Sequence, residues 1–322
     1  MDEASNLALA VDLGGTRTRC ALVDPGGRMV EQAAQDTQAW LGQQAAQERL
    51  EACLHRLMAR AGERPIAGIG VAAAGPVESA TGALHNPPNL PGWDGVALKP
   101  PWEEQFHLPV WVDNDANLAA LGEHRYGAGQ GISDLVYLAV GTGIGAGVIL
   151  DGRLVTGSRG MAGELGHMTI DLHGPRCACG NVGCLEALAS GTAIARMAQE
   201  RVAAGEQTLA LALAGNDPQR ITGELVTQAA EQGDRVAREI TEQAAQALGT
   251  GIVNILHIFN PALVIVGGGV GRAWHFLEPG IHQVVQRYAM RHSRDSLAIL
   301  PSALQDDAGL LGAASLVWAR PR

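Results

Sequence analysis

Two segments of the sequence share a pattern in which an apolar strand enters a glycine–threonine turn and leaves as a second strand. The first segment, LALAVDLGGTRTRCALVD, turns at Gly15 and Thr16, and the second, DLVYLAVGTGIGAGVILDGRLV, turns at Gly141 and Thr142. Glycines often occupy hairpin turns, but the pairing of Gly with Thr at the same point in both segments predicts an internal duplication. Two similar lobes would then each present a phosphate-sized hairpin to a shared cleft.

The same hairpins disfavour two common phosphate-binding motifs. Predicted strands at 7–13 and 19–23 flank the first turn. A dinucleotide fingerprint or a P-loop passes from its glycines into a helix, whereas these glycines lead into a strand.

The rest of the chain alternates strands and helices. The predicted elements are, in chain order, a strand at 66–73, a strand at 110–113, a helix from Asn114 or Asp115 to Gly127, a helix at 235–259, a strand at 262–266 and an amphipathic helix at 306–320. This alternation predicts an α/β protein with mixed sheets.

The composition limits the class of protein. A chain of 322 residues with 47% hydrophobic content can bury a sizeable core and is more consistent with two domains than with one. The formal net charge of −10 argues against nonspecific binding to nucleic acid or to an anionic membrane. No targeting segment is recognised in MDEASNLALAVDL, and glycines or polar residues interrupt each long apolar run. We therefore expect a soluble, cytoplasmic enzyme that binds neither nucleic acid nor membrane.

Three glycine groups, each after a predicted strand, indicate a nucleotide site. Glycine lets backbone amides approach an anion closely, and the run at 267–269 would let a base or ribose approach the main chain. Asp12, at the end of the first strand, is placed to hold a hydrated Mg²⁺, which takes one or two carboxylates and keeps several waters. The predicted nucleotide-binding residues are Asp12, Gly14, Gly15, Thr16, Gly141, Thr142, Gly143, Gly267, Gly268 and Gly269.

The sequence resembles the ROK family of repressors, open reading frames and sugar kinases through VDLGGTRT, DNDANLAALGE, GTGIGAG, GELGH, CACGNVGCLE, VIVGGG and AGLLGAA, which occur in the family's order. The resemblance runs from about residue 7 to 317. It implies a two-lobed, actin-like (ribonuclease H-like) ATPase fold, and phosphorylation of hexoses or acetylated hexosamines by ATP. We expect a small N-terminal lobe from residues 1–117 plus 306–322. Residues 118–305 would form a large lobe with a zinc site and the adenosine-binding region.

Asp115 is the expected catalytic base. A carboxylate where a strand opens into a helix is held rigidly, and in phosphoryl transfer such a group accepts the proton of the attacking hydroxyl. Asp is also a common helix N-cap, and the spacing alone leaves that alternative open. The match of DNDAN to the family's base-bearing motif favours the base, and Asn114 beside it matches a sugar-hydroxyl contact.

Several polar residues match the family's sugar ligands. An isolated glutamate is usually a solvated surface acid, but Glu164 and Glu186 lie beside the cysteine cluster in the sequence. Asn89 belongs to a proline-rich segment that a surface loop would also explain. The predicted sugar-binding residues are Gly75, Asn89, Asn114, Asp115, Glu164, His167 and Glu186.

Three of the five cysteines fall within the segment CACGNVGCLE. Cys177, Cys179 and Cys184 together with His167 form a ligand set that fills tetrahedral zinc and leaves no position for a catalytic water. A disulfide would leave one of these cysteines unpaired and His167 unexplained. We therefore expect a structural Zn²⁺, with one ring nitrogen of His167 on the metal and the other free for a sugar hydroxyl.

The leading hypothesis is an ATP-dependent hexose 6-kinase. The segment NPPNLPGW looks more like the family's glucokinases than its fructokinases, and N-acetylmannosamine or N-acetylglucosamine is the alternative substrate. By analogy with the family we also expect a homodimer or a larger homo-oligomer.

Two alternatives belong to other classes. A sugar-responsive transcription regulator is one, although a family repressor carries a helix-turn-helix domain ahead of the first turn, for which we expect no room here. A zinc hydrolase or a zinc-storage protein is the other. It fits less well, because four protein ligands leave no open position and the glycine turns would have no role.

Overall fold

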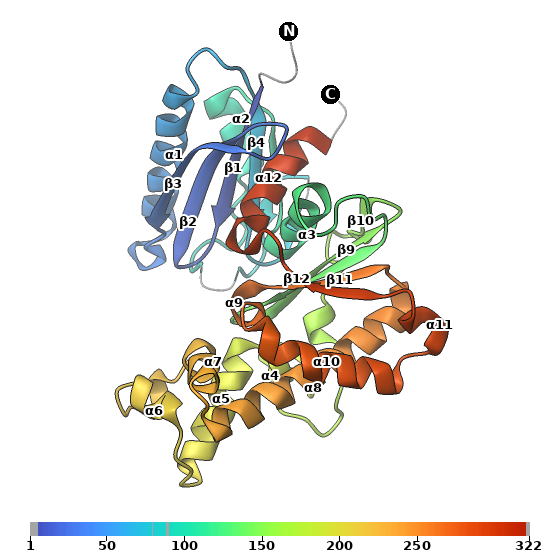
Figure 1. The fold of residues 1–322 in the computed structure, drawn as a ribbon. Helices are drawn as coiled ribbons and strands as arrows, with labels where there is room; N and C mark the ends of the chain where they lie inside the picture. The colour runs from blue at the N-terminus through green and yellow to red at the C-terminus, as the bar shows by residue number, and fades with distance from the viewer. Residues whose placement is uncertain (1–5, 79, 88–89, 320–322) are drawn as a thin grey trace.

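The computed structural model describes residues 6–78, 80–87 and 90–319, and two five-stranded mixed sheets dominate it (Figure 1). The first sheet has the strand order β3-β2-β1-β4-β7 and the second β10-β9-β8-β11-β12, while β5 and β6 form a separate pair. The strands are β1 (Leu7–Leu13), β2 (Arg17–Val23), β3 (Met29–Asp36), β4 (Ile66–Ala73), β5 (Val77–Glu78), β6 (Ala83–Leu84), β7 (Val110–Asn114), β8 (Leu135–Val140), β9 (Ile144–Leu150), β10 (Arg153–Leu154), β11 (Leu263–Gly267) and β12 (Ala298–Pro301).

Each sheet is built on one of the predicted hairpins. β1 pairs antiparallel with β2 across Gly14, where a β-carbon would lie 2.8 Å from the Arg17 carbonyl oxygen, so this tight turn requires glycine. β8 pairs antiparallel with β9, and the Gly141 N–H donates to the Gly143 carbonyl at 2.9 Å. Two parallel strands extend each hairpin, β4 and β7 in the first sheet and β11 and β12 in the second. The two sheets therefore share strand order and direction, which confirms the predicted duplication at the level of topology.

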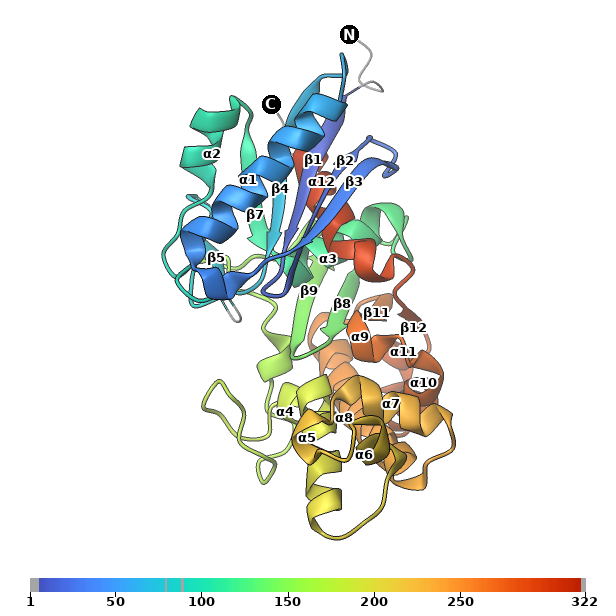
Figure 2. The same ribbon diagram turned by 90° about the vertical axis from the view of Figure 1, so that its left-hand side faces the viewer.

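Helices cover both sheets, and α1 lies across one face of the first sheet in Figure 2. The α-helices are α1 (Gln43–Arg60), α2 (Lys99–Phe106), α3 (Asp115–Tyr126), α4 (Leu185–Ala189), α5 (Gly191–Ala203), α6 (Leu209–Leu213), α7 (Gly223–Glu231), α8 (Arg235–Phe259), α9 (Gly268–Gly271), α10 (Trp274–Tyr288), α11 (Arg291–Arg294) and α12 (Ala308–Ala319). The 3-10 helices are η2 (Ala39–Leu41), η3 (Leu165–His167), η4 (Pro218–Arg220) and η5 (Gln305–Asp307).

The central strand β1 divides its side chains between two cores. Leu9 and Val11 pack in a core that includes residues of α1 and α2, whereas Ala8 and Ala10 pack in a core that includes α12. Because successive side chains of a strand point to opposite faces, large and small residues alternate along β1. The alanines leave room for α12 to approach the sheet closely.

Helices α3 and α12 lie between the two sheets (Figure 1). Each follows the last strand of a sheet, α3 after β7 and α12 after β12, so they are equivalent members of the duplication. Their backbones touch, because a β-carbon on Gly312 would overlap the Leu118 carbonyl oxygen and one on Gly122 would overlap that of Ala308. Since α3 also packs against β8 and β9, it contacts elements of both halves of the molecule.

The expectation of an amphipathic final helix is wrong. Every residue of α12 from 310 to 317 is buried, because the helix lies between the first sheet and α3 and has no broad solvent face. The limits predicted for the strands at 7–13 and 66–73 and the helix at 235–259 are confirmed, whereas the second strand begins earlier, at Arg17. The lobe boundaries at 117 and 306 stay a prediction. Within the described residues, no helix is long and apolar enough to cross a membrane.

The α3–α12 contact predicts a large effect of one added methyl group. Gly312→Ala should lower the free energy of unfolding by about 2 kcal/mol or more, because the methyl group displaces the Leu118 carbonyl. Urea denaturation measures the change. Gly269→Ala is the matched control, since, apart from its chain neighbours and its own helix backbone, no atom of a described residue lies within 4 Å of its β-carbon position. Equal stability of the two variants would contradict the close approach of α3 and α12.

Candidate active site

The predicted base lies where β7 passes into α3. The cap of this helix is Asn114, whose side-chain oxygen accepts hydrogen bonds from the N–H groups of Ala116 at 3.0 Å and Asn117 at 3.2 Å. Asn114 Nδ2 donates to the Gly75 carbonyl at 3.0 Å. The capping function therefore belongs to Asn114, and Asp115 is left as the first residue of the helix. One amide N–H of Asn114 remains for the predicted sugar contact.

Three of the predicted acids influence one another electrostatically. Burial raises the pKa of Asp115 to about 6; the Ala116 N–H opposes this shift, and the Glu164 carboxylate adds to it. Burial and then the charge of Asp115 raise the pKa of Asp12 to about 7, against the opposing charge of Arg19. Surrounding groups desolvate the Asp115 carboxylate, although the residue keeps part of its surface exposed, so that a ligand can reach it. Carboxylates from β1, α3 and the segment before η3 thus share one region, which favours hydroxyl donors or a cation there.

The sequence GELGH places Glu164 at the residue that caps η3 and His167 at the last residue of this single turn. His167 Nε2 lies 3.9 Å from Glu164 Oε2, and Nδ1 on the opposite side of the ring lies 3.7 Å from Cys177 Sγ. The two ring nitrogens therefore face different partners, a carboxylate on one side and the cysteines on the other.

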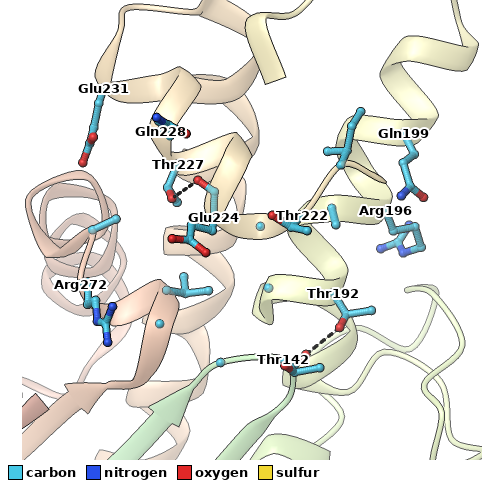
Figure 3. A pocket seen from close by; sticks show the side chains of 18 of the residues that line it. Thr142, Thr192, Arg196, Gln199, Thr222, Glu224, Thr227, Gln228, Glu231 and Arg272 are labelled. Atoms are coloured by element: carbon cyan, nitrogen blue, oxygen red, sulfur yellow. Dashed lines mark hydrogen bonds between the residues drawn. The ribbon is translucent and has the colours of Figure 1, made fainter. Parts of the chain in front are cut away.

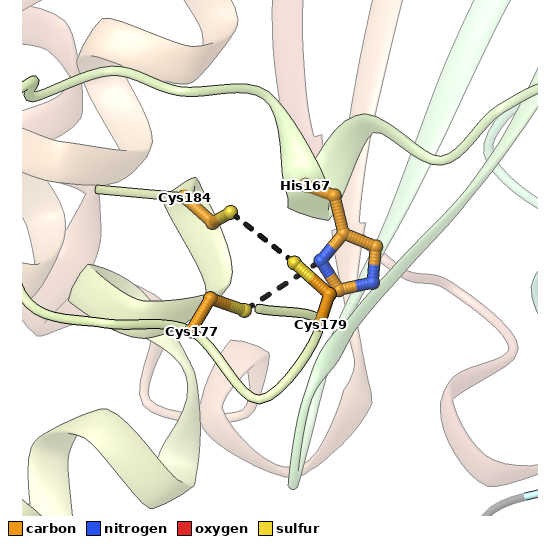
Figure 4. A group of neighbouring side chains, drawn as sticks. All are labelled: His167, Cys177, Cys179 and Cys184. Atoms are coloured by element: carbon orange, nitrogen blue, oxygen red, sulfur yellow. Dashed lines mark hydrogen bonds between the residues drawn. The ribbon is translucent and has the colours of Figure 1, made fainter. Parts of the chain in front are cut away.

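The four predicted metal ligands converge on one point, as Figure 4 shows. Their ligand atoms all lie within 4.8 Å of one another, and Cys179 Sγ is 3.7 Å from Cys184 Sγ. A tetrahedron with metal–sulfur bonds of about 2.3 Å has sulfur–sulfur edges of about 3.8 Å. The spacing of His167, Cys177, Cys179 and Cys184 therefore fits a single tetrahedral ion.

Glu186 connects this cluster with the second glycine turn. Glu186 lies in the first turn of α4; its Oε2 accepts from the Ile144 N–H at 2.8 Å, and its Oε1 lies 3.6 Å from Cys177 Sγ. A β-carbon on Gly143 would overlap the Glu186 carboxylate. The need for glycine at 143 thus has a cause that the sequence did not indicate, which is the approach of an internal carboxylate.

A cavity of about 990 Å³ opens beside the same turn (Figure 3). The turn is fixed to the start of α5, because the Gly191 N–H donates to the Gly141 carbonyl at 2.7 Å and Thr192 Oγ1 donates to the Thr142 carbonyl at 2.8 Å. Of the predicted nucleotide-binding residues, Gly141, Thr142 and Gly269 line this cavity.

The other predicted nucleotide residues are placed elsewhere. Gly267 and Gly268 line a neighbouring cavity of about 240 Å³. Asp12, Gly14, Gly15, Thr16 and Gly143 line neither of these two cavities. Gly75 adopts a positive φ of 93°, which favours glycine, and supplies the carbonyl that holds Asn114. Asn89 lies outside the described residues.

Sequence reasoning missed most of the polar wall of the large cavity. These side chains come from α5, from α7 with its preceding residue, and from the segments after α9 and β12: Arg196, Gln199, Thr222, Glu224, Gln228, Arg272 and Asp306. The α5 and α7 residues read as solvent-facing positions of amphipathic helices. No motif distinguishes them, and only the packing of α5, α7 and α9 brings them together.

Comparisons with known proteins agree with this architecture. The ROK family model matches residues 8–320. A glucokinase from Thermotoga maritima is 37% identical over 312 residues, which cover 97% of each chain. A xylose repressor from Caldicellulosiruptor bescii is 37% identical over 252 residues, which cover 78% of this chain and 62% of the repressor.

A solved structure extends the similarity to three dimensions. The ROK family glucokinase from Streptomyces griseus, in complex with glucose and AMPPNP, superimposes with a TM-score of 0.83 at 34% identity and covers 96% of this chain and 98% of its own. The expected two-lobed, actin-like α/β architecture is thereby confirmed. Since the family model and these relatives span nearly the whole sequence, the chain belongs to the ROK family.

Proposed function

We propose that this chain is an ATP-dependent hexose kinase that phosphorylates the 6-hydroxyl of glucose, with Asp115 as the general base. The observation that carries the proposal is the position of Asp115 at the start of α3, near Asp12 and Glu164, with a pKa raised to about 6. The Streptomyces griseus relative, which was solved with glucose and AMPPNP, supports the same pair of substrate classes.

The proposed reaction is an in-line transfer. The ionised Asp115 carboxylate takes the proton of the 6-hydroxyl as that oxygen bonds to the γ-phosphorus, and the bond from the γ-phosphorus to the bridging oxygen breaks, releasing ADP. A general base is most effective when its pKa is near the working pH, because it is then both ionised and basic. The Asn114 cap keeps the start of α3, and with it the Asp115 backbone, in one conformation.

The sugar would bind between Asp115 and the cysteine cluster. Glu164 accepts from sugar hydroxyls, and His167 offers the ring nitrogen that faces Glu164. Glu186 has one oxygen occupied by the Ile144 N–H, so it offers Oε1. Oε1 is free to accept from the sugar once Cys177 is a metal-bound thiolate, since a thiolate no longer donates. Asn114 contributes its remaining N–H, and Gly75 and Asn89 stay predicted contacts.

The nucleotide would place its adenosine in the large cavity and its phosphates at the Thr142 turn. The volume of about 990 Å³ accommodates such a ligand, and the wall offers carboxylate, amide and hydroxyl groups. Mg²⁺ would neutralise phosphate charge, held by Asp12 through water and by the phosphates themselves. The acids near Asp12 fit this role. Their negative charges repel the Asp12 carboxylate and raise its pKa, and a bound cation would offset this repulsion.

The ion proposed for the four-residue cluster is a structural Zn²⁺. Three thiolates and one imidazole are preferred zinc ligands, and four of them leave no open position for a reacting water. The cluster takes no part in phosphoryl transfer. Its role is to hold the His167 ring and the loop that precedes Glu186, so that both face the sugar.

A sugar-responsive regulator is the second candidate, favoured by the match to a xylose repressor over 78% of this chain. A regulator would bind the sugar without transferring phosphate, and a gel-shift with specific DNA would support it. Hexose-dependent ADP formation supports the kinase instead. The cytoplasmic location and the homo-oligomer stay predictions.

The role of Asp115 predicts a loss of turnover. Asp115→Asn should lower kcat for the preferred hexose by about 10²- to 10⁴-fold with a small change in KM, because the amide cannot accept the proton. A coupled ADP assay over glucose, mannose, N-acetylglucosamine and N-acetylmannosamine measures it. Asp151→Asn is the control, since Asp151 is exposed and its positive φ suits asparagine. Full activity of Asp115→Asn would exclude the proposed base, whereas preference for an acetylated sugar would change only the substrate.

The raised pKa of Asp115 predicts the acidic limb of the pH profile. Its carboxylate must be ionised to accept a proton, so kcat/KM should rise with pH and level off above a midpoint near the pKa of about 6. Initial rates measured between about pH 5 and pH 8 at constant ionic strength test this. A wild-type profile without such a limb would mean that another group is the base.

The structural role of the cluster predicts that metal and activity are lost together. Cys179→Ser should release the ion and remove most activity, because His167 and the loop before Glu186 lose their anchor. Metal analysis by mass spectrometry and the coupled assay measure both. The control is Cys53→Ala, which removes a thiol of α1 outside the cluster, and this variant should keep the zinc of the cluster. A zinc-free Cys179→Ser enzyme with unchanged kinetics would remove this explanation.

A further inference from the structure

The chain passes between the two sheets twice. The first crossing runs from the end of α3 through residues 127–134 into β8, and the second runs from β12 through residues 302–307 into α12. The relative placement of the sheets depends on these two segments, on the α3–α12 contact and on the packing of α3 against β8 and β9.

One buried carboxylate contacts both crossings. Glu123 lies in the last turn of α3, and none of its surface is exposed. Its Oε2 accepts from the Ala128 N–H of the first crossing at 2.7 Å. Its Oε1 accepts from Ser302 Oγ at 2.5 Å and from the Leu304 N–H at 2.9 Å, both in the second crossing.

Glu123 forms no ion pair with any described residue, so these three hydrogen bonds must stabilise its charge. Burying a carboxylate without hydrogen-bond partners costs free energy, so the native structure must keep these donors in place around Glu123. The surroundings are shaped to it, because a β-carbon on Gly127 would overlap Glu123 Oε2.

The environment of Glu123 continues toward the nucleotide side. Burial, and next the Glu123 charge, raise the pKa of Tyr137 on β8, and a β-carbon on Gly267 would overlap the Tyr137 hydroxyl. Glu123 is therefore close to the strand end that carries the 267–269 glycines.

The second crossing also leads to the large cavity. Ser302 Oγ accepts from the Gln305 N–H at 2.8 Å and so orients η5. In η5, Asp306 pairs with Arg272 of the cavity wall, and its carbonyl accepts from Arg19 of β2 at 2.6 Å.

We infer that Glu123 is a positioning residue, whose carboxylate joins the two crossings and thereby sets the place of Asp115 relative to the nucleotide cavity. Asp115 begins the same helix, and an α-helix rises about 1.5 Å per residue, so a rigid α3 transmits the position of Glu123 over about 12 Å. A displacement of about 1 Å at a reacting group can cost about 10²-fold in rate. The inference rests on the proposed kinase function.

Two variants remove the interaction in different ways. Glu123→Gln keeps the shape of the side chain but replaces one acceptor oxygen with an NH₂ group. This NH₂ group then faces an N–H or O–H group that also donates, so that hydrogen bond is lost. Ser302→Ala removes one donor, and Ser302→Thr restores the hydroxyl. Because Ser302 lines the cavity of about 240 Å³, we expect the added methyl group to be accommodated. Thr241→Val is the matched control, since this buried hydroxyl donates only to the Ala237 carbonyl within α8.

The experiment compares hexose kinase kinetics, ADP affinity and hydrogen exchange across these variants. We expect kcat to fall about tenfold or more in Glu123→Gln, and less in Ser302→Ala. Ser302→Thr and Thr241→Val should keep kcat within about twofold of wild type. ADP affinity should stay within about twofold of wild type in Glu123→Gln, because this variant keeps Ser302 Oγ, which accepts from the Gln305 N–H and orients η5, and leaves the cavity residues intact. The Ala128 or the Leu304 amide, whichever faces the new amide nitrogen, should exchange faster in Glu123→Gln only.

The outcomes separate this inference from the kinase proposal. If Glu123→Gln keeps wild-type kcat, or loses no more than Thr241→Val, Glu123 has no positioning role. If Glu123→Gln does not fold, the Ser302→Ala and Ser302→Thr pair decides, and equal kcat values for the two overturn the inference. If wild type transfers no phosphate to any hexose, the kinase proposal fails, and unchanged exchange at Ala128 and Leu304 would still contradict the role of Glu123.

Discussion

Close packing of α3 against α12 is the constraint on which the rest of the structure depends. Glycines at 122 and 312 let the two backbones touch, and the same helices follow the last strands of the two equivalent sheets. A helix held this firmly can present a side chain at its first residue with little freedom. Asn114 caps the start of α3, and Glu123 in its last turn accepts hydrogen bonds from both segments that connect the sheets. We therefore infer that both halves of the duplication determine the position of Asp115.

The cysteine cluster acts on the same region from the second half of the chain. The Nδ1 atom of His167 faces the cysteines of the cluster, and its Nε2 atom faces Glu164. Glu186 lies beside the cluster and accepts a hydrogen bond from the backbone of the second glycine turn. One set of metal ligands is thus linked both to the proposed sugar pocket and to the turn beside the nucleotide cavity. This linkage is the basis of our proposal that an ion in the cluster supports activity without taking part in the chemistry.

Much of the fold could be predicted because its signals are local. Alternating apolar strands, glycine turns and a capping asparagine specify the hairpins and the β7–α3 junction, and cysteine spacing specifies the metal cluster. The full burial of α12 could not be predicted, because it depends on the sheet and helix that enclose it. For the same reason the polar wall from α5 and α7 was missed, as was the cause of glycine at 143. Each of these depends on contacts between segments far apart in the sequence.

The position of Asp115 relative to a bound sugar is the central claim, and a crystal structure with glucose and a non-hydrolysable ATP analogue tests it most directly. A carboxylate oxygen of Asp115 should lie about 2.6–3.2 Å from the 6-hydroxyl, on the side of the sugar opposite the cysteine cluster and facing the γ-phosphate. A sugar bound away from α3, or an Asp115 side chain turned from the 6-hydroxyl, would contradict the account.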